Sequence, residues 1–392
     1  MVSAARKSAR RWCDGNRFTL LCDGEQFFPE MLEAIAGARE HIALEMYLAE
    51  SGPVATRFVD ALCAARARDV TVFVLLDDFG AFYLNRHDRQ RLNEAGVTLA
   101  RFNPLSPLKL AFNLVRDHRK LLLIDDRIAY VGGAGLTQDF ARELDGAAIE
   151  RSWRDNMIRA EGRCVGQWWG VFRANWRRWS DVACPLPPLR SVGHASGRVV
   201  AGRRGATVLT RAAIADIRRA RERVWLATPY FVPARGLRLA LARAARRGVD
   251  VRLLLPGPKT DHAGARAAGR RIYGGLLRRG VRVFEYQPAF LHAKMLLADE
   301  RAQIGSCNFD RWSERWNLEA NQAVEDTAFA DEVAGVFEYD FAECREVTWQ
   351  EWRQRPLGAR LHERFWGTLE TWAMRLSRRS HLVLGRMDRR RT

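Results

Sequence analysis

The sequence has no long hydrophobic run, which argues against a bilayer-spanning helix. Such a helix needs about 20 consecutive apolar residues, whereas the longest apolar stretch, around Val70–Leu76, has the length of a strand. The N-terminal residues MVSAARKSARRW are basic but have no apolar stretch behind them, so we expect no secretory signal peptide. Any contact with a membrane should therefore be peripheral.

Cysteine pairs of the Cys-x-x-Cys type are also absent. The seven cysteines are Cys13, Cys22, Cys63, Cys164, Cys184, Cys307 and Cys344. An odd number of scattered cysteines argues against a disulfide framework and against a zinc site, and it fits a reducing compartment. We therefore expect no bound metal ion and no cofactor.

Acidic residues are too few to balance the basic ones. The chain has 64 Lys and Arg against 46 Asp and Glu, which gives a net charge of +18. Such an excess favours a polyanionic partner, either nucleic acid or an anionic lipid surface. The length of 392 residues and the hydrophobic content of 47% suffice for two domains with their own cores.

What the chain does contain is an internal repeat. The segment ALCAARARDVTVFVLL at 61–76 returns as ALARAARRGVDVRLLL at 240–255, and three further matches follow the same order. In each half, segments with the apolar period of a helix alternate with short apolar runs that are typical of strands. This alternation predicts two tandem α/β domains with helices on both faces of a sheet that contains parallel strands.

The repeat and the local composition suggest where the domains begin and end. We expect a basic N-terminal segment at 1–16, a first domain at 17–183 and a second domain at 206–350. A Pro-rich linker at 184–205 should join them, and a basic amphipathic tail should follow at 351–392.

Both halves contain the pattern His-x-Lys-x-x-x-x-Asp, in residues His118, Lys120 and Asp125 and again in His292, Lys294 and Asp299. On a strand, residues two apart project to the same face, so each imidazole should lie beside an ammonium group. The two aspartates come at the expected strand ends, where they are better placed to bind neighbouring backbone than to react. A single such pattern carries little weight, but two copies at matching places indicate a catalytic site.

Small residues and a carboxylate follow each copy of the pattern. The turns are Gly132-Gly133-Ala134-Gly135 and Gly305-Ser306-Cys307-Asn308, whose small side chains let backbone N–H groups approach a phosphate. Asp155 follows the first turn and Glu319 follows the second. Either carboxylate could accept a hydrogen bond from Nδ1 of a histidine, which would leave Nε2 free to attack a substrate.

These residues resemble the signature of the phospholipase D superfamily, and within it the bacterial cardiolipin synthases that lack N-terminal membrane helices. The fullest match is in the second half. It comprises His292, Lys294, Asp299, Gly305, Ser306, Asn308, Asp310, Arg311, Ser313, Asn317 and Glu319. One departure is Gly135, where the family usually has an asparagine that would bind phosphate.

The resemblance implies a fold and a reaction. The fold would be two phospholipase D-type α/β/α domains with mixed, largely parallel sheets, related by a pseudo-two-fold axis with the active site at their interface. The reaction would transfer a phosphatidyl group between two phosphatidylglycerol molecules without a metal ion. His118 would be the nucleophile and His292 the acid and base. Lys120, Lys294 and Asn308 would bind the phosphate, supported by Ser306 and Gly133.

The resemblance also implies that the partner is an anionic phospholipid membrane containing phosphatidylglycerol, contacted at the cytoplasmic face of the inner membrane. We expect no nucleic acid and no obligate protein partner. Two segments could contact lipid. Val165–Trp179 is more simply interpreted as a core helix, whereas Leu361–Leu376 combines an apolar stripe with arginines. The alternatives are hydrolysis of phospholipid or transfer to another acceptor, a nuclease, and a non-catalytic membrane scaffold.

Overall fold

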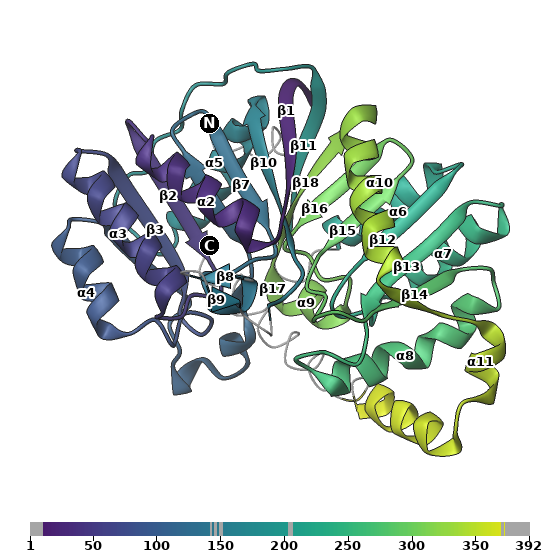
Figure 1. Cartoon of the computed structure of the whole chain (residues 1–392). Coiled ribbons are helices and arrows are strands. Elements are labelled where there is room, and N and C mark those ends of the chain that lie inside the picture. Colours follow the sequence, from purple (N-terminus) through teal and green to yellow (C-terminus); the bar gives the residue numbers. More distant parts are fainter. Residues whose placement is uncertain are drawn as a thin grey trace.

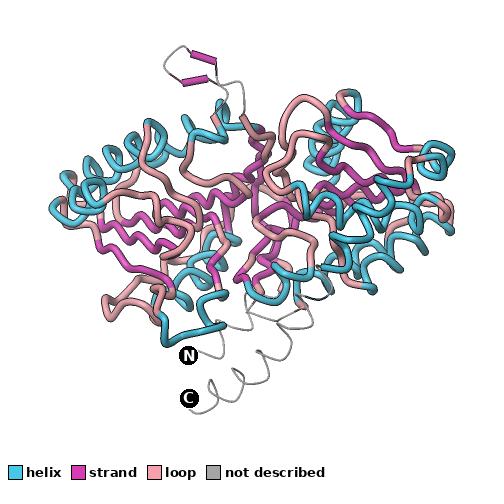
Figure 2. The backbone as a smooth tube through the Cα atoms, turned by 90° about the horizontal axis from the view of Figure 1, so that it is seen from below, coloured by secondary structure: helices cyan, strands magenta, loops and turns pink. Residues whose placement is uncertain are grey.

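The computed structural model describes residues 11–141, 152–202 and 207–369, together with Trp372 and the backbone of 143–144 and 147–148. Two halves lie side by side and share one sheet (Figure 1). Seen from below, strands run through the middle of both halves and helices cover them on either side (Figure 2). Among the described residues, no helix is both long enough and apolar enough to cross a bilayer.

Within the described residues, the first half contains ten strands, six helical segments and the first motif. Its strands are β1 (Cys13–Cys22), β2 (His41–Met46), β3 (Thr71–Asp77), β4 (Thr98–Phe102), β5 (Arg116–Asp117), β6 (Lys120–Ile124), β7 (Ile128–Gly132), β8 (Glu143–Leu144), β9 (Ala147–Ala148) and β10 (Asn156–Gly162). Its helices are α2 (Asp23–Ala36), α3 (Pro53–Ala67), α4 (Arg86–Glu94) and α5 (Arg163–Trp176), with 3-10 segments η1 (Pro107–Leu114) and η2 (Gln138–Phe140).

The second half repeats this order and carries the second motif. Its strands are β11 (Ala195–Ala201), β12 (Arg223–Ala227), β13 (Asp250–Pro256), β14 (Arg282–Tyr286), β15 (Met295–Ala298), β16 (Arg301–Gly305), β17 (Asn317–Leu318), β18 (Ala320–Glu325) and β19 (Cys344–Val347). Its helices are α6 (Val208–Arg219), α7 (Arg235–Arg246), α8 (Ala263–Leu277), α9 (Arg311–Trp316), α10 (Thr327–Ala342) and α11 (Trp349–Gln354). Residues 357–369 are also helical.

The large sheet has the strand order β19-β14-β13-β12-β15-β16-β18-β11-β1-β10-β7-β6-β2-β3-β4. Apart from β19, the order read outward from the β1–β11 pair is the same in both halves, which confirms the tandem repeat and its pseudo-two-fold relation. The expectation of two mixed sheets is corrected in one respect, because β1 and β11 pair and join them into one.

The expectation of largely parallel strands is also wrong. Only β2–β3, β3–β4, β12–β13 and β13–β14 are parallel among the described pairs of the large sheet. The reason is the short connection after each motif strand. Three residues separate β6 from β7 and two separate β15 from β16, too few for the crossover that a parallel pair requires.

Two strands at the centre of the sheet lie partly or wholly outside the domain boundaries expected from the sequence. Strand β11 lies within the segment 184–205 that was expected to be a linker, and the start of β1 lies within the expected N-terminal segment 1–16. The two strands bond to each other in the middle of the sheet. The junction between the halves is therefore built of paired strands as well as of the irregular residues before β11.

Helix α5 is a core helix, as its simpler interpretation predicted. Trp168, Trp169, Phe172 and Trp176 are all completely buried in it. Trp168 donates from its indole nitrogen to the side chain of Gln322 in β18, at 2.8 Å, so this core crosses from one half to the other. The tryptophans of this segment are thus unavailable to a lipid surface.

A buried ion triad adds a second link between the halves. The guanidinium of Arg154 donates to Asp23 in the first half at 2.8 Å and to Asp340 in the second half at 2.9 Å. All three side chains are buried. Removing one member of a buried ionic group is costly because the partners keep their charge without compensation.

We expect Arg154→Met to lower the thermal midpoint by about 5 °C or more, because two buried carboxylates lose their counter-charge. The control is Arg17→Met, which removes a largely exposed ion pair to Glu161 and should shift the midpoint by about 1 °C or less. Calorimetry of the purified proteins measures both. Equal shifts for the two variants would show that the triad does not hold the halves together.

Candidate active site

The two motifs meet where the halves join. Strand β6 begins at Lys120 and strand β15 begins directly after Lys294, so the histidines precede their strands and do not lie within them. Each ammonium group donates to the carbonyl oxygen of its own histidine, with 2.8 Å between Lys120 Nζ and His118 O. The predicted contact between imidazole and ammonium is present in the second motif, where Nζ of Lys294 lies 2.8 Å from Nδ1 of His292. In the first motif the ammonium of Lys120 bonds to the histidine backbone.

Asp125 and Asp299 bind backbone, as their position predicted. The carboxylate of Asp125 accepts from the backbone N–H groups of residues 39–41 at 2.8–3.2 Å. Asp299 accepts from those of residues 221–223 at 2.8–3.1 Å. Each aspartate thus fixes the start of the neighbouring strand, β2 or β12. Both have positive φ, 50° and 53°, in the tight turn that ends the motif strand.

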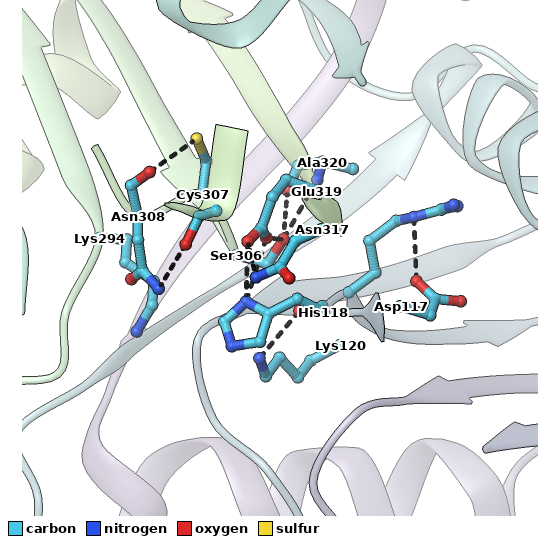
Figure 3. A network of polar contacts seen from close by, with 12 residues as sticks. Asp117, His118, Lys120, Lys294, Ser306, Cys307, Asn308, Asn317, Glu319 and Ala320 are labelled. Atoms are coloured by element: carbon cyan, nitrogen blue, oxygen red, sulfur yellow. Dashed lines mark hydrogen bonds and ion pairs between the residues drawn. The ribbon is translucent and has the colours of Figure 1, made fainter. Parts of the chain in front are cut away.

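Each histidine is paired with the carboxylate of the other half. Nδ1 of His118 lies 3.0 Å from Oε1 of Glu319, and Nδ1 of His292 lies 2.6 Å from Oδ2 of Asp155. Figure 3 shows Glu319 reaching over His118. An ionised carboxylate can only accept, so Nδ1 of each ring carries the hydrogen. Nε2 of His292 lies 3.2 Å from Nζ of Lys294.

Short backbone pairings produce this crossing. Strand β5, directly before His118, pairs in parallel with β17, directly before Glu319. In the same way Arg154, directly before Asp155, bridges to Leu291, directly before His292. The His118 N–H donates to the Leu318 carbonyl at 3.0 Å, and the His292 N–H donates to that of Arg154 at 2.8 Å. Because each contact joins the two halves, neither half alone assembles a histidine–carboxylate pair.

The carboxylates are supported differently on the two sides. Ser306 Oγ donates to Glu319 at 2.5 Å, and Asn317 donates to its other oxygen at 3.2 Å. The first half has Gly133 at the place of Ser306, and a Cβ there would lie 2.4 Å from an oxygen of Asp155. Gly133 therefore makes room for the Asp155 carboxylate, which is a different role from contacting phosphate.

The amide of Asn308 remains available to a ligand. This residue is buried, and its Nδ2 donates one N–H to Ser313 Oγ at 3.5 Å, which leaves the second N–H for a phosphate oxygen. The equivalent position in the first half is Gly135, where a Cβ would lie 2.7 Å from the Leu48 carbonyl oxygen. An asparagine at 135 would need Leu48 to shift, so the chain is built around glycine at this position.

Burial lowers the pKa of every base in the site. It lowers the pKa of Lys120 to about 7 and that of Lys294 to about 8, although Glu319 opposes the shift of Lys120 and Asp155 that of Lys294. The pKa of His118 is lowered by burial, against the pull of Glu319. The pKa of His292 falls well below its usual value because of burial and the charge of Lys294. Burial raises the pKa of Asp155 to about 6.

The basic groups of the site also act on one another. Two ammonium groups and two imidazoles share a buried space, and they lower one another's pKa: the charges of Lys120 and His118 both contribute to the shift of His292. A bound phosphate diester would restore the charge of both lysines, because an opposite charge nearby favours the charged form. The site is thus arranged for a phosphate group.

Aromatic rings surround the histidines. Tyr47 packs on His118 with ring centroids 4.7 Å apart, and the ammonium of Lys120 lies over the same ring. Trp153 and Phe290 pack on His292 at 5.0 Å and 5.7 Å. They exclude water from the imidazoles. Of the three, Phe290 lies in a stretch that carries no motif in the sequence.

The described residues contain no cluster of three His, Cys, Asp or Glu side chains that could hold a metal ion. The basic groups that meet here are the two lysines and the two imidazoles, and each imidazole is held by one carboxylate. Such a set can bind a phosphate anion directly.

Residues 31–149 and 213–341 match the protein family described as "Cardiolipin synthase, PLD-like domain". Cardiolipin synthase A of Pseudomonas aeruginosa is 35% identical over 85% of this chain and 68% of its own length. The major cardiolipin synthase ClsA of Bacillus subtilis is 30% identical over 89% of this chain and 74% of its own.

The fold is also similar to solved structures. The phosphatidylserine synthase of Haemophilus influenzae matches with a TM-score of 0.67 and 13% identity, over 94% of this chain and 98% of that one. The polyphosphate kinase of Porphyromonas gingivalis matches with a TM-score of 0.60 and 14% identity, over 85% of this chain and 49% of that one. These similarities identify the architecture of the two joined halves.

The free energy of unfolding shows whether Asp125 has a structural or a chemical role. We expect Asp125→Ala to lower the free energy of unfolding by about 2–4 kcal/mol, because three backbone N–H groups lose a charged acceptor. Asp126→Ala is the matched control. It removes only a pair to the exposed Arg190 and should cost less than about 1 kcal/mol. Urea titration followed by circular dichroism measures the difference. A fully stable but inactive Asp125→Ala protein would instead place Asp125 in the chemistry.

Proposed function

The chain belongs to the phospholipase D-like cardiolipin synthase family, which makes it a phosphatidyltransferase, and we propose that it joins two phosphatidylglycerol molecules into cardiolipin and releases glycerol. The observation that carries this proposal is the pair of crossed histidine–carboxylate contacts around a space lined by two lysines. One histidine can attack phosphorus while the other acts as general acid and base. Transfer of a phosphatidyl group requires both roles.

In the first step, Nε2 of one imidazole attacks the phosphorus of a bound phosphatidylglycerol. A P–N bond forms and the P–O bond to the glycerol headgroup breaks. The second histidine, protonated at Nε2, gives this proton to the departing glycerol oxygen. Lys120, Lys294 and the Asn308 amide stabilise the charge on the non-bridging oxygens, a contribution that usually dominates such reactions.

In the second step, the second histidine is neutral and acts as a base. It removes the proton from a free hydroxyl of another phosphatidylglycerol, whose oxygen attacks the phosphorus. The P–N bond breaks, the first histidine is regenerated and cardiolipin leaves. The aromatic rings around His118 and His292 favour this outcome over hydrolysis, because they limit the access of water to the phosphohistidine.

His118 is our proposed nucleophile. Its partner Glu319 is held by Ser306 and Asn317, so the orientation of the His118 ring is supported from two sides. The stronger lowering of the pKa of His292 applies to the site without phosphate, where Lys294 and Lys120 repel its proton. A phosphate anion between them reduces this repulsion and lets His292 carry the proton that the leaving group needs.

We also propose that the protein works at the cytoplasmic face of the inner membrane. All seven cysteines are free thiols, which supports a reducing compartment. The excess of positive charge supports contact with an anionic lipid surface.

The purified protein should convert phosphatidylglycerol vesicles to cardiolipin and free glycerol in equal amounts. His118→Ala and His292→Ala should each lower the rate by at least about 1000-fold while the unfolding transition is kept, because each removes a reacting group. Mass spectrometry of the products and of trapped phosphohistidine tests both roles. Release of phosphatidic acid instead of cardiolipin would make the protein a hydrolase, and near-normal turnover in either variant would exclude the two-histidine mechanism.

The pH dependence of kcat/KM should be bell-shaped, with a maximum between about pH 6 and pH 8. On the acid side, activity falls as Asp155 gains a proton, because its pKa is raised to about 6. On the alkaline side, activity falls as Lys120 and Lys294 lose protons, since their pKa values are lowered to about 7 and about 8. Arginine keeps its charge, so the residual activity of Lys120→Arg should have its alkaline limb at higher pH. If the alkaline limb of Lys120→Arg stays at the same pH as that of the parent, a group other than Lys120 causes it.

A further inference from the structure

Two segments of the described structure are turned inside out. In both, apolar side chains face solvent, while the one lysine of the first segment and the one carboxylate of the second bond to the protein. One is the loop 104–114, which contains η1 and leads through β5 to His118. The other is the helical segment 357–369, which packs on α8. A protein surface normally has the opposite arrangement, so an apolar phase outside the protein is the simplest explanation for both.

The loop 104–114 is held together by polar contacts on its inner side. Asn103 donates to the carbonyls of Phe112 and Val115, both at 2.9 Å, and Lys109 donates to the carbonyl of Pro104 at 2.6 Å. Asn113 and Ser106 bond to each other twice. The only charged side chain of the loop is therefore turned inward and the backbone is braced from within.

The outer side of this loop is formed by leucines. Leu108 is 94% exposed and Leu110 is 79% exposed, and Leu105 and Leu114 are also exposed. Leu110 has a positive φ of 42°, a conformation that is unfavourable for a branched side chain and that is retained here with the side chain in solvent. The adjoining turn adds Phe82 and Tyr83, which are exposed as well.

The helical segment 357–369 has the same inverted arrangement. Its only acidic residue, Glu363, is buried and accepts from Arg270 at 3.2 Å and from Arg355 at 3.0 Å. Trp366 packs against Gly264 of α8 on the same inner side. The exposed stripe, spaced four residues apart, consists of Leu357, Leu361, Phe365 and Leu369. Leu361 is 65% exposed and Phe365 is 61% exposed, with the exposed Arg364 beside them.

Both segments lie at the same edge of the molecule. In Figure 1 the loop 104–114 projects from the lower edge of the first half, and the yellow helix at 357–369 projects from the lower edge of the second. Between them lie α9 and β17, which lead to Glu319 and His118. The two apolar segments therefore flank the active site from opposite sides.

We propose that these two segments insert into the surface of an anionic phospholipid bilayer and hold the active site against it. This inference rests on the proposed function for its choice of lipid. A bilayer supplies the apolar phase for the leucines and contains the substrate. The exposed side chains of 357–369 include that of Arg364, and its one carboxylate, Glu363, is buried, which suits an anionic headgroup layer. A second protein copy on this edge would cover the active site.

The test is flotation with vesicles of pure phosphatidylglycerol. We expect the double variants Leu108→Ser/Leu110→Ser and Leu361→Ser/Phe365→Ser each to bind at least about tenfold more weakly than the parent protein, because less apolar surface enters the lipid. The control is Val182→Ser/Leu186→Ser, which alters two exposed apolar residues of the irregular segment before β11 and should bind unchanged. Binding of both test variants equal to that of the parent would overturn the proposal.

A soluble substrate separates this proposal from the proposed function. All variants should turn over monomeric short-chain phosphatidylglycerol within about twofold of the parent, since His118 and His292 are untouched, while turnover on vesicles falls with binding. A different outcome is that the parent makes cardiolipin from neither substrate while the variants still lose vesicle binding. That result would overturn the proposed function but support insertion of the two segments into the bilayer. If light scattering shows instead that the leucine variants dissociate a dimer, the surface belongs to a second copy and the proposal is wrong.

Discussion

The structure depends on the exchange of carboxylates between the two halves. His118 is oriented by Glu319 and His292 by Asp155, at 3.0 Å and 2.6 Å, so each catalytic pair is complete only when the halves are joined. The features around the junction serve this contact. The paired strands β1 and β11, the Arg154 triad and the tryptophans of α5 all fix the relative position of the halves. A shift of about 1 Å between them would separate both imidazoles from their acceptors, which is enough to impair a catalytic geometry.

The cost of this site is electrostatic. Four basic groups are buried together, and burial lowers the pKa of each of them. A phosphate group at the centre makes such an arrangement favourable, because an opposite charge nearby favours the charged forms that burial disfavours. Folding therefore brings the basic groups together against their mutual repulsion, and binding of the phosphate relieves that repulsion. The folding energy comes from elsewhere, chiefly from the apolar core that is continuous across both halves.

Much of this could be predicted from the sequence, and the failures have physical causes. The repeat and the spacing of His118, Lys120 and Asp125 revealed two equivalent α/β units and the backbone-binding role of the aspartate. Sequence spacing could not show that Asp155 serves His292, since that choice depends on the bridge between residues 154 and 291. The antiparallel pairing was missed because short apolar runs do not reveal strand direction. The exposed loop 104–114 was missed because its leucines resemble buried ones until the contacts of Asn103 and Lys109 are known.

The two copies of the site have diverged where the reaction needs them to differ. On one side a long carboxylate, Glu319, is held by the hydroxyl of Ser306, whereas on the other a short one, Asp155, occupies the space that Gly133 leaves open. Despite their different lengths, both carboxylates reach Nδ1 of a histidine, at 3.0 Å and 2.6 Å. Their surroundings do not match: both lysines lower the pKa of each histidine, but at His118 the charge of Glu319 opposes this lowering. A reaction in which one histidine bonds to phosphorus and the other transfers a proton requires two similar positions with unequal proton affinities. Duplication supplied the similarity, and the exchange of a glycine for a serine and of an aspartate for a glutamate supplied the difference.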